Sequence, residues 1–304
     1  MRVSSRIGLL GPLLAAALLL LGPGVRAEVK TVEQAYPELS SGVLMKARMV
    51  EMEKEMLVLS DGIQLKESRI QEIVERSDPK IRDEVRKSQL FLLENEVTKA
   101  LLLKEAAAST DVKGLSERET IQAYLGRKFQ DVQASFAEVT AYYQDNKAMF
   151  KGLPFTQVKE TIQQVLNQLK REEAVASFIR GLGSRTEIQV NRKWVEAQVP
   201  LAKDNPVDKA RMSGKPSMIE FGADGCAPCA AMEPILENVR KNYRDKLNVV
   251  FVHVGENPVL GSRFGIQSIP VQAFYDRSGK EFFWHVGFFP EEELVKKLRE
   301  MGVQ

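Results

Sequence analysis

The chain has 304 residues, of which 44% are hydrophobic and 28% are charged, and its formal net charge is +2. This length allows two ordinary domains, and the composition is that of a globular protein, which excludes a disordered chain and a multi-span membrane protein. The near-neutral charge provides no basic surface for nucleic acid, so we expect no nucleic-acid partner.

Residues 1–27 have the pattern of a secretory signal peptide. Arg2 and Arg6 precede an apolar run from Ile7 to Leu21, and small residues end at Ala27. The run has about fifteen residues, whereas a membrane span needs roughly 20, so cleavage after Ala27 is favoured over a retained anchor helix. We therefore expect a periplasmic or otherwise exported protein. Its formal charge falls from +2 to −1 on cleavage, because the removed segment contains three arginines and no acid.

Residues 28–197 are predicted to form an all-α domain. Apolar residues at helical spacing mark the inner faces of two long helices: Leu90, Leu93, Val97 and Leu101 in one, and Val158, Ile162, Val165, Leu166 and Leu169 in the other. Two further helices begin at capping boxes: Ser116 with Glu119, and Ser135 with Glu138. One small β element, Met56 to Leu59, ends in the turn Ser60-Asp61-Gly62.

Four methionines, Met45, Met49, Met52 and Met56, also recur at helical spacing. Methionine side chains adapt to irregular apolar partners, so such a face could bind unfolded chains. Packing in the core or at a dimer contact is the favoured interpretation.

A polar segment punctuated by prolines, residues 198–215, is predicted to be a linker, within which Val207 to Met212 could form a short helix. Strands and helices alternate in residues 216–304. The predicted strands are Ser217–Phe221, Leu247–Val254, Val271–Tyr275 and Glu281–Val286, and the predicted helices are Ala230–Asn242, Asn257–Phe264 and one that begins at Pro290. This order, a βαβ unit followed by ββα, predicts an α/β domain. The chain is therefore expected to be a multidomain protein.

The chain has only two cysteines, Cys226 and Cys229, and both lie between the first strand and the first helix of this domain. The unpaired N–H groups and the dipole of a helix N-terminus favour a thiolate at Cys226. In an oxidising compartment such a pair forms a disulfide unless a partner reduces it. The spacing and position are typical of a redox motif.

Three motifs follow one another in the C-terminal part: Glu220-Phe221-Gly222-Ala223-Asp224-Gly225-Cys226-Ala227-Pro228-Cys229, Ile269-Pro270 and Gly279-Lys280. In order and spacing they resemble the thioredoxin family. The resemblance implies that Cys226 is the attacking thiol, Cys229 the resolving thiol and Pro270 a cis-proline facing the disulfide. It further implies that Glu220 relays the proton of the resolving thiol, and that the substrate contacts Gly225, Ala227, Pro228 and Ile269.

The resemblance implies no dissociable cofactor and no metal. Two residues depart from the family pattern. Gly225 stands in place of a tryptophan, which changes the expected substrate surface. Glu220 stands in place of an aspartate, which keeps the carboxylate and lengthens its reach.

The helical part carries Val58-Leu59-Ser60-Asp61-Gly62-Ile63, a predicted long helix from Ile81 to Ala106, and the stretch from Ser135 to Phe150 that contains Tyr142-Tyr143. These segments resemble the N-terminal domain of the SurA-type periplasmic chaperones. In that family a parvulin prolyl isomerase domain can follow the tyrosine-rich helix. Here only Lys151-Gly152-Leu153 separates that helix from Pro154 and the next predicted helix, so the isomerase domain is expected to be absent.

Each motif has a simpler interpretation. The cysteines could be half of a zinc site completed by His253 and His285, or a structural disulfide, although so short a loop constrains the unfolded chain little. The redox interpretation is favoured over both. The two histidines are predicted to be packed or surface residues. Glu220 could be a buried carboxylate with an internal partner, but its offset from Cys226 favours the relay.

The sequence therefore predicts an exported thiol–disulfide oxidoreductase that acts on the cysteines of unfolded or partly folded clients. It would exchange electrons with a membrane or periplasmic thiol partner. The alternative is a non-catalytic periplasmic chaperone or assembly factor that uses the thioredoxin fold as a docking platform. A redox assay separates the two, because a docking platform would not reduce a disulfide.

Overall fold

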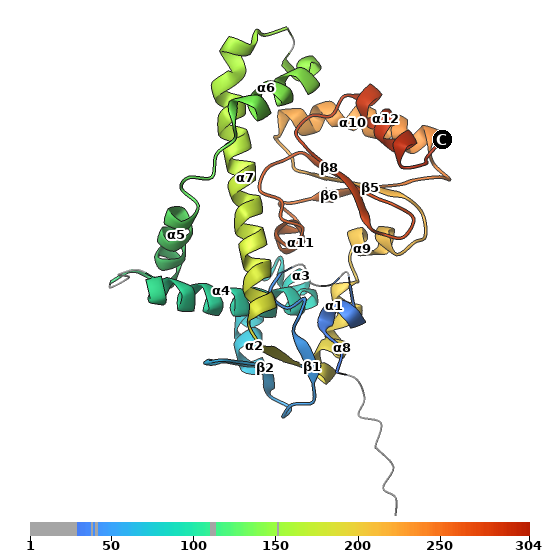
Figure 1. Ribbon diagram of the computed structural model, residues 1–304. Coiled ribbons are helices and arrows are strands. Elements are labelled where there is room, and N and C mark those ends of the chain that lie inside the picture. The colour runs from blue at the N-terminus through green and yellow to red at the C-terminus, as the bar shows by residue number, and fades with distance from the viewer. Residues whose placement is uncertain (1–28, 38, 40–41, 110–113, 151) are drawn as a thin grey trace, which may run out of the picture.

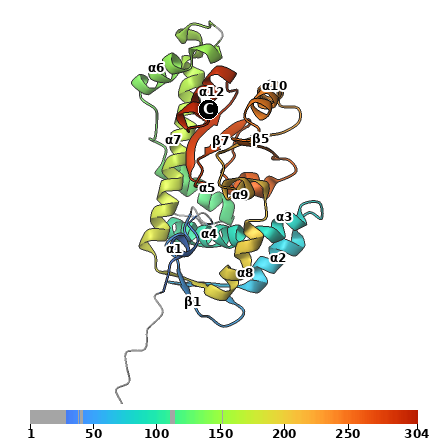
Figure 2. The same ribbon diagram turned by 90° about the vertical axis from the view of Figure 1, so that its right-hand side faces the viewer.

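The computed structural model describes residues 29–37, 39, 42–109, 114–150 and 152–304. The predicted signal peptide, residues 1–27, lies outside the described residues. A mainly helical N-terminal region is followed by a C-terminal domain built on a four-stranded sheet (Figure 1). The long helix α7 (Phe155–Arg185) leaves the N-terminal region and runs alongside the C-terminal domain in both views (Figures 1 and 2).

The N-terminal region combines helices with a small sheet. Its helices are α1 (Val32–Ala35), α2 (Glu67–Arg76), α3 (Arg82–Lys87), α4 (Gln89–Ser109), α5 (Glu117–Lys128), α6 (Phe136–Asp145), the 3-10 helix η1 (Lys147–Phe150), α7 and α8 (Arg192–Ala202). Its strands are β1 (Arg48–Val50), β2 (Met56–Ser60), β3 (Ile63–Lys66) and β4 (Ile188–Asn191). The sheet order is β1-β4-β2-β3, in which β1 runs parallel to β4 and the other pairs are antiparallel.

The prediction of an all-α domain is wrong for this region, although the predicted β turn is confirmed. β2 and β3 form a hairpin around Asp61 and Gly62, and the φ of 75° at Gly62 is a conformation that glycine adopts without strain. The sequence did not predict β4. This strand is defined by its partners in the sheet, because Gln189 lies in register with Arg48 of β1 and Leu59 of β2. Pairing between segments so far apart in the chain leaves no local pattern in the sequence.

The predicted long helix from Ile81 to Ala106 is two helices, α3 and α4. They meet at Ser88, whose N–H donates to the carbonyls of Glu84 and Val85 and so ends α3. The predicted inner face of α4 is confirmed, because all four of its apolar residues are buried: Leu90, Leu93, Val97 and Leu101. The methionine face is wrong, since Met49 lies in β1 and Met56 in β2 rather than on one helix.

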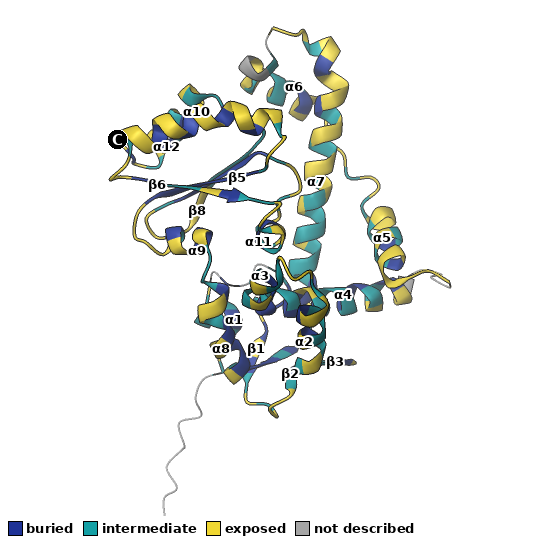
Figure 3. Cartoon of the chain, turned by 180° about the vertical axis from the view of Figure 1, so that it is seen from behind, coloured by how far each residue is buried: buried dark blue, intermediate teal, exposed yellow. Residues whose placement is uncertain are grey.

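The far end of α7 carries a separate small core. Four buried residues from α6, α7 and the segment before α6 form it: Ala134, Val139, Val158 and Ile162. The predicted apolar face of α7 extends past this core, so Val165 and Leu169 remain exposed. Figure 3 shows exposed residues in yellow along much of this part of α7. Both predicted capping boxes are confirmed, at the starts of α5 and α6.

The C-terminal domain has the predicted order of strands and helices. Its strands are β5 (Ser217–Gly222), β6 (Asn248–His253), β7 (Val271–Tyr275) and β8 (Glu281–Val286), and its helices are α9 (Pro206–Arg211), α10 (Ala227–Asn242), α11 (Pro258–Arg263) and α12 (Glu291–Glu300). The sheet order is β6-β5-β7-β8, with β5 parallel to β6 and the other pairs antiparallel. Two cores cover its two faces, one with α10 and α12 and the other with α9 and α11 (Figure 1).

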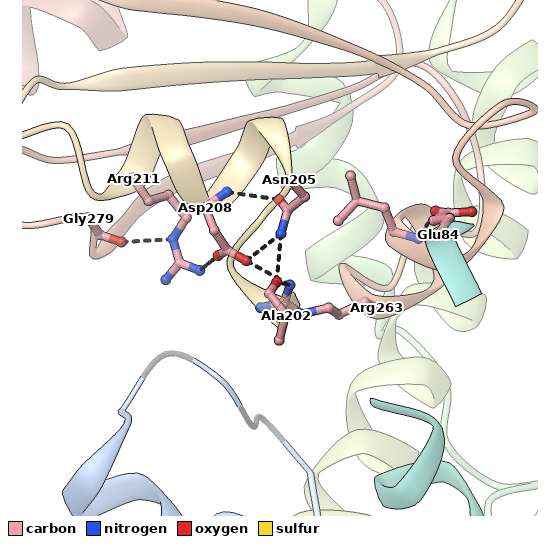
Figure 4. A network of polar contacts seen from close by, with 8 residues as sticks. Glu84, Ala202, Asn205, Asp208, Arg211, Arg263 and Gly279 are labelled. Carbon is pink, nitrogen blue, oxygen red and sulfur yellow. Dashed lines mark hydrogen bonds and ion pairs between the residues drawn. The ribbon is translucent and has the colours of Figure 1, made fainter. Parts of the chain in front are cut away.

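Polar contacts join the N-terminal region to the C-terminal domain around α9 and α11 (Figure 4). The Asp208 carboxylate of α9 accepts hydrogen bonds from Arg211 at 3.2 Å and Arg263 at 2.7 Å. Arg263 also donates to the carbonyl of Ala202 at the end of α8. At the other end of α11, the Leu260 N–H donates to Glu84 of α3 at 2.7 Å. Residues 198–215, predicted as a linker, therefore include α9 and this junction.

Within the described residues, no helix is long and apolar enough to cross a membrane.

The close approach of α7 to the N-terminal core gives a first prediction. A Cβ at Gly183 would lie 2.4 Å from the carbonyl oxygen of Val43 and 2.5 Å from its Cα. Overpacking of this kind costs about 1–3 kcal/mol, so Gly183→Ala should lower the free energy of unfolding by at least that amount, measured by urea denaturation of the full chain.

Gly126→Ala in α5 is the matched control. A Cβ there meets nothing within 4 Å in the described part of the chain, and alanine favours a helix over glycine by about 0.5–1 kcal/mol. This variant should be as stable as the parent or more so. Equal unfolding midpoints for the two variants would contradict the packing of α7 on Val43.

Candidate functional site

The two cysteines lie where β5 ends and α10 begins. β5 is buried along its whole length, and the turn after it includes Gly225, whose φ is 74°. Cys226 is the N-cap of α10, and its Sγ accepts a hydrogen bond from the Cys229 N–H at 3.2 Å. Cys226 and Cys229 form a disulfide whose Cα atoms are 5.2 Å apart. The sulfur of Cys226 therefore lies at the positive end of the helix dipole.

The two cysteines differ in exposure. Cys229, in the first turn of α10, is 7% exposed, whereas Cys226 is only partly buried. Three of the residues predicted to contact substrate are exposed around it: Gly225, Ala227 and Pro228. A molecule approaching from solvent therefore meets the Cys226 end of the disulfide.

The loop before β7 lies against the same end of the disulfide. The Ile269–Pro270 peptide bond is cis, and the carbonyl oxygen of Ile269 lies 4.0 Å from the Sγ of Cys226. Pro270 is buried, and Ile269 is partly buried. The structure thus brings the predicted residues of two distant segments, 225–229 and 269–270, to one place.

Glu220 faces α10 from the middle of β5. Side chains alternate along a strand, so Met218, Glu220 and Gly222 share one face. Met218 packs in the same core as Met232 of α10. A Cβ on Gly222 would lie 3.6 Å from the Cβ of Cys229. Glu220 is therefore the neighbour, on the same face of β5, of Gly222, the position that lies beside Cys229.

The carboxyl of Glu220 is 1% exposed. Neither of its oxygens has a hydrogen-bond partner within the described chain, and the same holds for the amide of Gln272, its cross-strand neighbour on β7. Burial raises the pKa of Glu220 to about 8, and the nearby Gln272 amide and Arg240 charge only partly oppose this shift. The value is close to the ordinary thiol pKa of about 8.5.

The histidines have other partners. His253 Nε2 accepts a hydrogen bond from the Asp224 N–H at 3.1 Å, which ties the end of β6 to the turn before Cys226. His285 stacks on Phe289 with ring centroids 4.2 Å apart, and burial lowers its pKa. No group of three or more potential metal ligands occurs in the part of the chain that the structure describes. Sequence reasoning did not reveal the contact of His253 with the turn, because it depends on the pairing of β5 with β6.

A buried cysteine next to an accessible one at a helix N-terminus, in a domain with this sheet order, defines a thioredoxin-like thiol–disulfide oxidoreductase. The thioredoxin family model matches residues 199–300. Thioredoxin of Alicyclobacillus acidocaldarius subsp. acidocaldarius is 34% identical over 98 residues, which are 32% of this chain and 92% of that protein. The chain belongs to the thioredoxin family through this C-terminal domain.

Two longer relatives match only in part. Thioredoxin-like protein HCF164, chloroplastic, of Arabidopsis thaliana is 34% identical over 99 residues, 32% of this chain and 38% of that protein. The protein of the same name from Oryza sativa subsp. japonica is 31% identical over 132 residues, 43% of this chain and 50% of that protein. Members of the family use the cysteine pair itself as redox centre, need no cofactor, and act on cysteine-containing substrates and redox partners.

The buried acid gives a prediction about stability. In the folded protein Glu220 holds its proton up to about pH 8, whereas its unperturbed value is 4.5. Between these values the native state binds one more proton than the unfolded state, so stability falls as pH rises, by about 1.4 kcal/mol per pH unit.

Glu220→Gln removes this titration. The oxidised variant should therefore be more stable than the parent at pH 9, by several kcal/mol, and close to it at pH 5. Guanidinium unfolding of both proteins at the two pH values measures the difference. A stability difference that does not change with pH would show that the carboxyl is not held protonated.

Proposed function

We propose that the protein is an exported thiol–disulfide oxidoreductase that acts, through the Cys226–Cys229 pair, on cysteines of unfolded or partly folded clients. The observation that carries the proposal is the accessible Cys226 at the N-terminus of α10, beside Ile269 and with Cys229 buried behind it. The sequence of residues 1–27 supports export, with cleavage after Ala27.

The reaction has two steps. The thiolate of reduced Cys226, stabilised by the helix N-terminus and the Cys229 N–H, attacks one sulfur of a client disulfide. The client S–S bond breaks, a mixed disulfide with Cys226 forms, and the other client sulfur leaves as a thiolate that takes a proton from water. Glu220 in its ionised form, a minor fraction at neutral pH because its pKa is about 8, takes the proton of Cys229. Cys229 then attacks the Cys226 sulfur, and the second client sulfur leaves as a thiolate that takes a proton from water.

Two electrons have then passed from the protein to the client, and the Cys226–Cys229 disulfide remains. A membrane or periplasmic thiol partner reduces it by the reverse sequence, during which Glu220 returns its proton to Cys229. Running in the opposite direction, the same steps oxidise a client dithiol. Gly225, Ala227, Pro228 and Ile269 form the surface that the client segment meets in either direction.

The helical region, residues 28–197, is proposed to bind the client. Its resemblance to the SurA-type N-terminal domain motivates this role, and only residues 146–154 separate α6 from α7, which leaves no parvulin domain between them. The far end of α7 supports it as well. Phe136 of α6 is 62% exposed. Three more apolar side chains are also exposed: Leu153, just before α7, and Val165 and Leu169 on α7.

The junction supports delivery of a bound client to the disulfide. Residues from the middle of α7 line one groove of about 750 Å³ together with Gln267, two residues before Ile269. Glu84 caps α11, and Lys87 of α3 pairs with Asp204 at 2.9 Å. A client held by α6 and α7 would thus be near the active-site loop, which raises its effective concentration there.

The two cysteines should have unequal roles. Cys229→Ser should accumulate mixed disulfides with client proteins, because the attack by Cys226 survives and the resolving step is lost. Cys226→Ser should accumulate none. Non-reducing gels after incubation of the reduced variants with an oxidised, unfolded protein measure this. Wild-type turnover by both variants would contradict the proposed role of the cysteine pair.

The exposed phenylalanine of α6 should matter only for large substrates. Phe136→Ser should raise the KM for an unfolded protein disulfide about tenfold or more and leave the reduction of a small disulfide unchanged, since burying an aromatic side chain on a client contributes about 1.5–3 kcal/mol. The matched control is Phe282→Ser, because Phe282 of β8 is also exposed and lies at the end of the hairpin away from Pro270. Equal KM values for the two variants would argue against client binding by α6.

A further inference from the structure

The sheet edge next to the buried acid is covered by one aromatic ring. β6 is an edge strand of the sheet, and Phe251 on it is paired in register with Glu220 on β5. Neighbours in register on parallel strands point to the same face. Phe251 therefore lies on the face that carries Glu220 and Gly222, between them and the solvent beyond the edge.

The ring reaches the inner cysteine. A Cβ on Gly222 would lie 2.9 Å from Cε2 of Phe251 and 3.6 Å from the Cβ of Cys229. The ring edge, the Gly222 backbone and Cys229 thus meet at one point. Phe251 is 43% exposed, whereas Glu220 and Cys229 are 1% and 7% exposed. Part of the ring is thus exposed to water, and its edge lies at Gly222 beside the buried Cys229.

We propose that Phe251 is a positioning residue for the resolving step: its ring closes the open edge of the sheet over Glu220 and Cys229 and keeps water from the pair that exchanges the proton. The proposal rests on the relay role of Glu220 given above. It also explains the glycine at position 222, since any side chain there would displace the ring from this place.

The groups around Glu220 show why the cover is needed. The Gln272 side chain on β7 and the charge of Arg240 on α10 both favour the ionised carboxylate. On β6 the same face carries Phe251 and His253. Cys229 of α10 is the titratable group of the reaction. Burial alone therefore keeps the proton affinity of Glu220 near that of a thiol. Water admitted at the edge would stabilise the carboxylate, lower its pKa and make it a weaker base for Cys229.

The cover can be tested without any reaction. In the oxidised full-length protein Cys229 does not titrate, so ¹³C NMR of the Glu220 carboxyl reports its pKa directly. Phe251→Ala should lower the titration midpoint by about one pH unit or more. Phe251→Leu, which keeps an apolar cover, should restore most of it. Phe282→Ala, at the exposed phenylalanine of the opposite edge strand, should leave it unchanged. An unchanged midpoint in Phe251→Ala overturns the proposal.

The link to the chemistry needs a second measurement. Reduced protein is mixed with a small aromatic disulfide, and release of the second thiol is followed by stopped flow between pH 5 and pH 10. The rate should rise with pH through the midpoint set by Glu220, and in Phe251→Ala that midpoint should fall and the plateau should drop. If the NMR midpoint falls and the rate profile does not, the positioning role is overturned.

Glu220→Gln separates this outcome from failure of the relay. If the rate profile of Glu220→Gln equals that of the parent protein, the proposed relay is wrong, and the NMR titration still decides whether Phe251 covers the acid. If the profile of Glu220→Gln changes and that of Phe251→Ala does not, the relay stands and the role of Phe251 is refuted.

Discussion

The placement of the active-site loop depends on one buried carboxylate, Asp208. Its side chain is 4% exposed and forms ion pairs with Arg211 and Arg263, which are 12% exposed. A buried charge without a partner costs several kcal/mol. Loss of either the acid or its arginine partners would therefore destabilise this part of the fold. Because Arg263 ends α11 and also holds the carbonyl of Ala202, this network fixes α11 on α8 and α9. The chain leaves α11 only a few residues before the Ile269–Pro270 bond.

The opposite end of α11 is held from the N-terminal region. The first N–H groups of a helix have no partner within it, and the Glu84 carboxylate of α3 supplies one for Leu260. α11 is therefore fixed by acids at both ends, one from each part of the molecule (Figure 4). Two ends fixed in this way define the position of the helical region, and with it α7, relative to the disulfide. The domain that carries the chemistry and the region proposed to hold the client are thus joined through the helix next to the active-site loop.

Local patterns were enough to predict the C-terminal domain, and they failed where distant segments meet. The buried strand before Cys226 and the helix after it can be read from adjacent residues, and the resemblance of Ile269-Pro270 to a family motif identified the loop that faces them. The inner face of α4 was equally local. The break at Ser88 carries neither glycine nor proline, so periodicity continues through it. The pairing of β4 with β1, the cap of α11 by Glu84 and the cover of Glu220 by Phe251 all join segments whose proximity only the fold determines.

Glu220, a buried carboxyl without a hydrogen-bond partner in the described chain, makes the fold less stable rather than more. Buried polar groups are nearly always hydrogen-bonded, yet the structure leaves both Glu220 and Gln272 without such bonds in the described chain, side by side in the centre of a sheet. The cost stays moderate because the carboxyl keeps its proton at neutral pH, where its pKa of about 8 leaves only a minor fraction ionised. A carboxyl in a wet site would be ionised there and would have no proton to return to Cys229 when a partner reduces the disulfide. The burial that weakens the fold at high pH also keeps the pKa of the acid near that of a thiol, which is what the proposed relay requires.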